Sequence, residues 1–394
     1  LAAPEGPAEP GGFDFRRMAY FEQLGAVGYT RNPVMLWADP DPGAQWINRL
    51  RTRLAAAMMA AMPGDAGAFA AGAMTGDRSG ISQDTVQALR DSNLAHLLAI
   101  SGMNMAFITG FVFMLVRYGV ALVPPLALRV NAKKLAAVVA FMVALFYLQL
   151  SGANVATMRA FLMVMVMLGA VLLDRRGLTM RSVALAGVVL LLAEPESLLE
   201  PGFQLSFAAT VVLIAGFEAL DRQILREKLP RWLMPVFAMV LTSVLAGLAT
   251  APFAAATFNR FTDYGLLANL LTAPVMSVLM AAGAMAALLA PVGLAAPAYW
   301  LLELSSRWIL FVAHWVAGLD GAVTPIIAPG PVVIPLITFG GAWVILWRGS
   351  WRLAGAAPIV AALVLWGFAA RPDLLISSDG ALVGIATPEG RALS

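Results

Sequence analysis

Ten strongly apolar segments between residues 94 and 370 constrain the fold of this chain more than any other feature. A helix that crosses a membrane needs about 17 to 25 mainly apolar residues, and 60% of the 394 residues are hydrophobic while 12% are charged. The sequence therefore predicts an all-α polytopic membrane protein with about ten transmembrane helices, some of them short, broken or re-entrant. The segments are 94–116, 135–151, 158–173, 182–194, 204–217, 232–256, 265–290, 298–318, 331–347 and 353–370.

The basic residues between these segments predict their orientation. If the first segment runs from outside to inside, the loops on the inner side carry thirteen basic residues, whereas the opposite loops carry only Arg159 and Arg260. The positive-inside rule then places both ends of the chain on the outer side. The thirteen are Arg117, Arg129, Lys133, Lys134, Arg175, Arg176, Arg181, Arg222, Arg226, Lys228, Arg231, Arg348 and Arg352.

The segment 298–318 allows two interpretations, because it also carries Glu303, Arg307 and His314. If it crosses the membrane, the last basic loop stays inside, in agreement with the charge rule. Alternatively, it lies on the surface as an amphipathic helix.

The first 92 residues differ from the apolar centre. Residues 1–45 are polar and rich in proline and glycine, with a short strand-like stretch at 26–30, and we expect them to be the tail of an external domain. Within 46–92 we expect two amphipathic surface helices. The first, 46–62, suits a position on the bilayer or on the membrane domain, and the second, 82–92, has Ser82 as its N-cap.

The membrane domain is expected over 93–371, and 372–394 changes character again. Alternating apolar residues around Asp379-Gly380 predict the first strands of an external β domain, which the sequence enters without completing. Since the chain also begins at Leu1, we expect it to be part of a longer protein.

The sequence contains few candidate catalytic residues. It has no cysteine and no HExxH, P-loop or GxSxG motif, and His96 and His314 lie far apart without neighbouring carboxylates. We therefore expect no enzyme, no cofactor and no metal site. Outside 298–318, the centres of the segments hold no Asp or Glu, which argues against an ion-coupled transporter.

Polar residues that interrupt the apolar segments all map to the outer side. Groups buried in hydrocarbon need partners, so these residues either line an outward-opening polar vestibule or join helices locally, and both interpretations stay open. The candidates are His96, Ser101, Gly102, Asn104, Ser151, Gly152, Asn154, Arg159, Gln204, Ser206, Arg260 and Asn269.

The pattern Ser-Gly-x-Asn occurs twice among these residues, at 101–104 and 151–154. Gly102 and Gly152 permit a helix break or a close helix approach. The flanking residues match poorly, so we interpret the pair as coincidence rather than as an internal repeat.

Arg159 and Arg260 are also open to two interpretations. Guanidinium groups suit phosphate, so a polyanion that enters here would meet them; alternatively they pair with Glu200 or Asp263. Nearby aromatic residues either contact a ligand or belong to the membrane interface: Phe203, Phe207, Phe258, Phe261 and Tyr264.

Five motifs, in order, resemble the competence domain of the ComEC family. They are "GDRSGIS", "LAHLLAISGMNMAFITGFVF", "SGANVATMRAFLMV", "PESLLEPGFQLSFAATVVL" and "FNRFTDYGLLANLLTAPV", and the resemblance covers residues 75–290, then more loosely to 370. The two ends resemble the family's external OB-like domain and the start of its metallo-β-lactamase-like domain.

The resemblance implies a channel for single-stranded DNA in the bacterial cytoplasmic (inner) membrane during natural transformation. It further implies a periplasmic DNA receptor and a cytoplasmic helicase or translocase as partners, with self-association left open. All the candidates above except Asn104 and Asn154 match family motif positions, and many relatives have a histidine where this chain has Asn104. The rival hypotheses are a small-solute permease and a noncatalytic scaffold for external domains.

Overall fold

The computed structural model describes residues 1–7, 14–30, 35, 43, 45–98, 100, 102–153, 155–175, 179–221, 230, 232–370, 373–376, 383–386 and 392–393. Ser101 and Asn154 lie outside the described residues, as does the turn at 379–380. The chain divides into two compact units. Unit 1 comprises Leu1–Pro42, Thr250–Phe261 and Pro325–Ser394, and unit 2 comprises Gly43–Ala249 and Thr262–Thr324.

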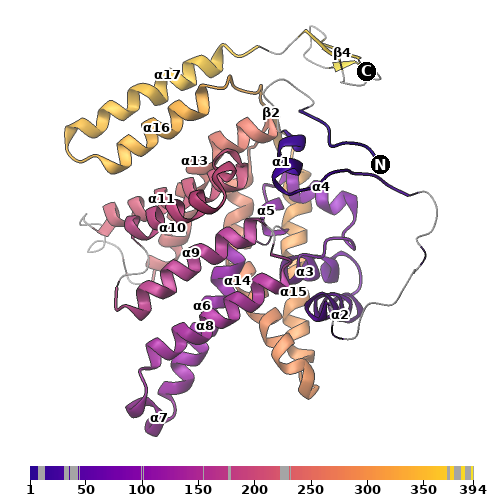
Figure 1. Cartoon of the computed structure of the whole chain (residues 1–394), viewed down its shortest axis with the longest axis vertical. Coiled ribbons are helices and arrows are strands. Elements are labelled where there is room, and N and C mark those ends of the chain that lie inside the picture. The colour runs from indigo at the N-terminus through magenta and orange to yellow at the C-terminus, as the bar shows by residue number, and fades with distance from the viewer. Residues whose placement is uncertain are drawn as a thin grey trace. The chain divides into compact units, whose positions relative to one another are not determined.

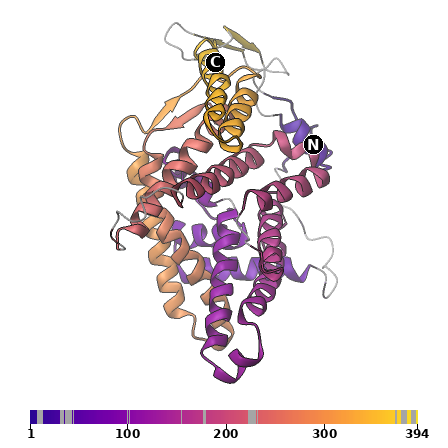
Figure 2. The same cartoon turned by 90° about the vertical axis from the view of Figure 1, so that its left-hand side faces the viewer.

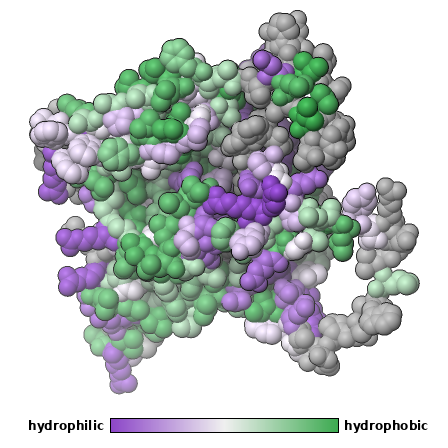
Figure 3. Space-filling view, turned by 45° about the horizontal axis from the view of Figure 1, so that its top comes forward, coloured by the Kyte–Doolittle hydropathy of each residue, from purple (hydrophilic) through white to green (hydrophobic). Residues whose placement is uncertain are grey.

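Each predicted apolar segment overlaps a helix, which confirms the all-α polytopic membrane fold. Among the described residues, six stretches are long and apolar enough to cross a membrane. Hydrophobic residues cover much of the surface in Figure 3. The ten helices are α6 (Gly102–Ala121), α8 (Ala132–Leu150), α9 (Val155–Leu172), α10 (Met180–Ala193), α11 (Pro201–Asp221), α13 (Met234–Phe258), α14 (Gly265–Leu289), α15 (Ala296–Ala317), α16 (Val333–Leu346) and α17 (Ala356–Gly367).

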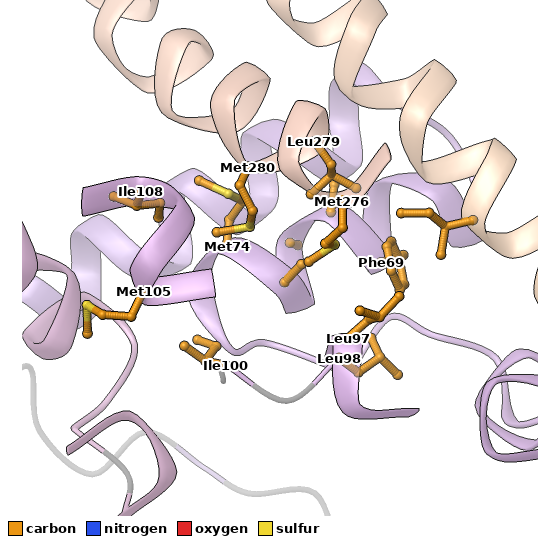
Figure 4. Packing of buried hydrophobic residues seen from close by; sticks show 14 of the residues in the cluster. Phe69, Met74, Leu97, Leu98, Ile100, Met105, Ile108, Met276, Leu279 and Met280 are labelled. Atoms are coloured by element: carbon orange, nitrogen blue, oxygen red, sulfur yellow. The ribbon is translucent and has the colours of Figure 1, made fainter. Parts of the chain in front are cut away.

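A short helix that sequence analysis missed lies in the core of unit 2. Every residue of α3 (Asp65–Thr75) from Ala66 onward is buried, and the helix packs against α2 (Trp46–Ala61), α14 and α15. Figure 4 shows its Phe69 and Met74 among side chains of α14, of α5 (Ala95–Leu98) and of Ile100, which follows α5. Alanine and glycine fill most positions of α3, so neighbouring helices approach its backbone closely.

The two expected amphipathic helices flank α3. In α2, Met58 and the following Met62 are buried while Trp46 is exposed, so the predicted apolar face packs onto the membrane domain rather than onto lipid alone. In α4 (Gln83–Asp91), Ser82 Oγ accepts a hydrogen bond from Thr85 N at 3.3 Å. This confirms the predicted N-cap.

The helices α14 and α15 form an antiparallel pair (Figures 1 and 2). A 3₁₀ turn, η2 (Ala290–Val292), joins them at one end. At the other end Asp263 N donates to Ala322 O at 3.1 Å, and Thr324 Oγ1 donates to Asp263 Oδ2 at 2.7 Å. Helix α15 packs along α14, but it is not among the six candidate spans found in the described residues, so both interpretations of 298–318 stay open.

The remaining elements of unit 2 are short. They comprise α7 (Pro124–Arg129) and η1 (Pro195–Leu199). Strand β1 (Arg260–Thr262) precedes α14 and pairs with β2 (Val323–Pro325), which follows α15; both strands include residues of each unit.

Unit 1 contains a helical hairpin and the predicted strands. The 3₁₀ helix η3 (Ser350–Gly355) connects α16 to α17. The strands β3 (Leu374–Ile376), β4 (Val383–Ala386) and β5 (Ala392–Leu393) form an antiparallel sheet in chain order, as the alternation predicted. Near the N-terminus, the strand-like stretch forms a single bridge between Val27 and Ala2, and α1 spans Phe15–Phe21.

Candidate functional site

The first apolar segment is broken where its Ser-Gly pair occurs. Helix α5 ends at Leu98 and α6 begins at Gly102, with Ile100 buried between them. A β-carbon at Gly102 would lie 3.9 Å from Ala160 Cβ, an ordinary contact distance. The predicted helix break is therefore present, and it lies against α9.

The second Ser-Gly pair ends α8. Ser151 Oγ donates to Leu148 O at 2.8 Å, and Gly152 has φ +92°, the left-handed conformation that glycine adopts most readily after a helix. Arg51 of α2 donates from Nε to Leu150 O at 2.5 Å and from Nη2 to Gln149 O at 3.1 Å. A cation thus caps the negative end of α8, a role that its sequence position did not reveal.

Both Ser-Gly regions meet at Gly76, the first residue of the motif "GDRSGIS". Gly76 ends α3 with φ +83°. A β-carbon there would lie 3.2 Å from Ile100 Cδ1 and 3.3 Å from Ser151 O, tighter than most real contacts. Three motifs that are separate in the sequence therefore converge at the end of α3.

Asn104 lies in the interior beside α3. Its side chain is fully buried, and its Nδ2 donates to Ala73 O at 3.4 Å. The same carbonyl accepts a hydrogen bond from Tyr147 Oη at 3.2 Å. Asn104 Oδ1 has no partner among the described residues, and an amide oxygen buried in this way costs about 1–3 kcal/mol.

Arg159 forms a buried ion pair, one of the two alternatives that its sequence position left open. The residue is 7% exposed, and Nη1 lies 2.8 Å from Glu200 Oε2. Its guanidinium occupies the space beside Gly202, where a β-carbon would clash with it. In the same segment Gln204 Nε2 donates to Leu198 O at 3.2 Å, and Ser206 is half-buried on α11.

The surroundings of this ion pair are acidic. Burial raises the pKa of Glu194, at the end of α10, and the charges of Glu196 and Glu200 raise it further, while Arg159 opposes them. A carboxylate with a raised pKa is held in an environment that disfavours its charge. An anion near this site would therefore be attracted by the guanidinium of Arg159 and repelled by the neighbouring carboxylates.

The start of α14 lies beside the residues that precede α5. His96 is exposed, with Nδ1 2.8 Å from Asn93 O, as expected of a helix-end residue bonded to a neighbour. A β-carbon at Gly265 would lie 2.8 Å from Asn93 Cβ, so the stretch before α5 contacts α14. Asn269, about one turn further along, is half-buried.

Arg260 belongs to the other unit. It is half-buried in β1 and already interacts with another group, and its position relative to the candidates of unit 2 is not defined.

The candidate aromatic residues fall into two groups. Phe203 and Phe207 stack on each other with centroids 4.2 Å apart, and a β-carbon at Gly187 would lie 3.1 Å from Phe207 Cε1. Phe203 is buried and Phe207 is half-buried, so this pair packs mainly against the protein. By contrast, Phe258, Phe261 and Tyr264 are 55%, 40% and 37% exposed, so they remain available for ligand or lipid.

Comparison with known proteins agrees with the order of the motifs. A family model described as "Competence protein" matches residues 74–351. The chain is 25% identical over 353 residues to "ComE operon protein 3" of Bacillus subtilis (strain 168), which covers 86% of this chain and 41% of that protein. It thus spans less than half of that relative. No solved structure matches significantly. The chain therefore belongs to the ComEC family of competence proteins.

Proposed function

We propose that this chain is the membrane domain of a DNA-uptake protein and conducts single-stranded DNA across the bacterial cytoplasmic membrane without catalysis. The convergence at Gly76 carries this proposal: Ile100, just before the first Ser-Gly pair, and Ser151, in the second, both lie against the end of α3. Beside them, Gly102 approaches α9, and α9 carries Arg159. DNA would enter at this end, which the charge rule assigns to the outer face, together with both ends of the chain.

The partners follow from the same proposal. A chain without a nucleotide-binding motif needs an external energy source, so a cytoplasmic helicase or translocase would pull the strand, and a periplasmic receptor would deliver it. The short β segments at the two ends would continue into external domains, and self-association would be compatible with the lipid-facing helices.

A noncatalytic scaffold is the second candidate, and a specific observation favours it. Asn104, Ser151 and Arg159 are buried and bonded to groups of the protein itself. A scaffold needs no more than this, whereas a conduit must open at α3 to expose them. The permease hypothesis has less support, since the candidate residues gather at helix ends rather than around a midplane site.

Cysteine labelling distinguishes a conduit from a scaffold. The chain contains no cysteine, so Asn104→Cys can be placed in the full-length protein after any cysteines elsewhere are replaced. A conduit predicts that a membrane-impermeant thiol reagent labels this cysteine in cells that are taking up DNA, and not in resting cells. Ala140→Cys, equally buried on α8, is the control and should stay unlabelled. Absence of labelling at residue 104 during active uptake would contradict the conduit.

An exchange of the buried ion pair tests Arg159 itself. The variant R159E/E200R keeps the two charges together but places an anion on α9. If Arg159 guides DNA, DNA still binds to cells but cytoplasmic arrival falls, with normal membrane insertion. The matched exchange E303R/R307E alters the more exposed ion pair on α15 and should leave uptake unchanged. Uptake at the wild-type level in R159E/E200R would assign Arg159 a purely structural role.

A further inference from the structure

An aromatic and basic cluster lies at the turn between α16 and η3, away from the motifs considered above. Trp343 and Trp347 stack face to face, with ring centroids 4.2 Å apart and planes 1° apart. Trp343 Nε1 donates to Trp351 O at 3.0 Å, which ties the turn to the helix. Figure 1 shows α16 and α17 lying side by side as an antiparallel pair.

Close backbone packing holds this turn in place. A β-carbon at Gly340 would lie 2.6 Å from Gly355 O, and one at Gly355 would lie 2.7 Å from Gly340 O. The backbones of α16 and η3 therefore approach each other closely at these two glycines. The larger side chains of the turn face outward, and four of them are at least half exposed: Leu346, Trp347, Trp351 and Leu353.

The charged side chains of the turn are two guanidinium groups, which donate hydrogen bonds. Arg348 and Arg352 are exposed, and within the part of the chain that the structure describes neither guanidinium pairs with a carboxylate. The sequence has no Asp or Glu from Gly321 to Pro372. Guanidinium groups bind phosphate oxygens through several N–H donors at once, so this cluster is complementary to a phosphate group.

We propose that the turn binds one anionic phospholipid. Its phosphate would lie between Arg348 and Arg352, with Trp347 and Trp351 at headgroup level and the acyl chains along the exposed leucines. A lipid fits better than a nucleic acid because the cluster joins two apolar helical stretches, of which Ser350–Gly367 is long enough to cross a membrane. Indole and guanidinium groups at such a helix end lie where hydrocarbon meets headgroups.

Lipid titration of the full-length protein tests the site. Native mass spectrometry of the detergent-solubilised protein would compare phosphatidylglycerol with phosphatidylcholine of the same acyl chains. We expect R348Q/R352Q to weaken phosphatidylglycerol binding about 25-fold, at about fivefold for each arginine, and to leave phosphatidylcholine binding unchanged. R348K/R352K keeps the charges but loses the several N–H donors of each guanidinium, so its phosphatidylglycerol affinity should lie between those of wild type and R348Q/R352Q.

Three results would overturn the proposal. The first is unchanged phosphatidylglycerol binding by R348Q/R352Q. The second is an equal loss in R117Q/R129Q, which removes the same charge from two exposed arginines in α6 and α7. The third is loss of oligothymidylate binding by R348Q/R352Q with lipid binding intact, since the cluster would then serve nucleic acid.

Discussion

Two regions of unit 2 carry the family motifs, and they are held together by different means. Around α3, the motif segments meet through shape: Gly76 leaves room for Ile100 and Ser151, and all of α3 after Asp65 is buried. Between α9 and α11, the motif segments meet through charge, because Arg159 and Glu200 form the contact. Because most residues of this chain are apolar, the hydrophobicity of a segment does not by itself show whether that segment lies in the protein interior.

The size of the side chains explains why α3 is covered by protein whereas most of α11 is only partly covered. The α3 helix is made largely of alanine and glycine and is covered by protein. Helix α11 carries many larger apolar residues, and the residues from its second turn onward are at most half-buried. Lipid solvates a large apolar side chain as well as protein does, whereas small residues allow backbones to approach and gain packing energy. Close packing therefore marks the interior here.

The largest expected effect comes from filling space beside α3. A β-carbon at Gly67 would clash with the backbone oxygen of Met62, and backbone cannot move aside as a side chain can. We expect G67A to lower the free energy of unfolding by about 3 kcal/mol or more, measured by thermal unfolding in detergent. The control G110A in α6 has open space around it and should be neutral or stabilising by about 0.5–1 kcal/mol. If G67A and G110A changed the free energy of unfolding equally, close packing at Gly67 would not be what stabilises this region.

A smaller loss is expected from the region held by charge. E200Q leaves the guanidinium of Arg159, 7% exposed, without its anion. We expect a loss of about 2–3 kcal/mol, below the usual range for a fully buried pair because Glu200 is partly exposed. E303Q in the more exposed pair with Arg307 should cost no more than about 0.5 kcal/mol. If both substitutions cost the same in thermal unfolding, the buried pair does not hold α9 to the segment before α11.

The smallest effect depends on pH. Because the pKa of Glu194 is raised in the folded protein, its ionisation costs stability. The cost is absent below the pKa of an unfolded glutamate, about 4.3, and is fully present above the folded pKa. E194Q should therefore stabilise the protein by a few tenths of a kcal/mol at pH 7 and match wild type near pH 4. A lower melting temperature of E194Q at pH 7 would show that the Glu194 charge supports Arg159 instead.

Sequence analysis predicted some of the site and missed the part that organises it. It identified Ser82 as an N-cap, Gly102 as a helix break and Glu200 as one of two partners for Arg159, and all three are present. It assigned no helix to residues 63–75, because an eleven-residue helix of small side chains is too short for a span and has no marked polar face. Gly67 and Gly72, set among alanines, were the available signal.

The sequence by itself determined the all-α membrane fold, the helix break and the amphipathic face of α2. These properties depend on hydropathy, length and capping within one segment, so local patterns suffice to predict them. Only the tertiary structure decided that α3 lies at the centre, that Arg51 caps α8 and that Asn104 points into the interior. The contacts of Arg51 and Asn104 join residues about thirty or more positions apart, and apolar segments of similar composition give no local indication of which neighbours they meet.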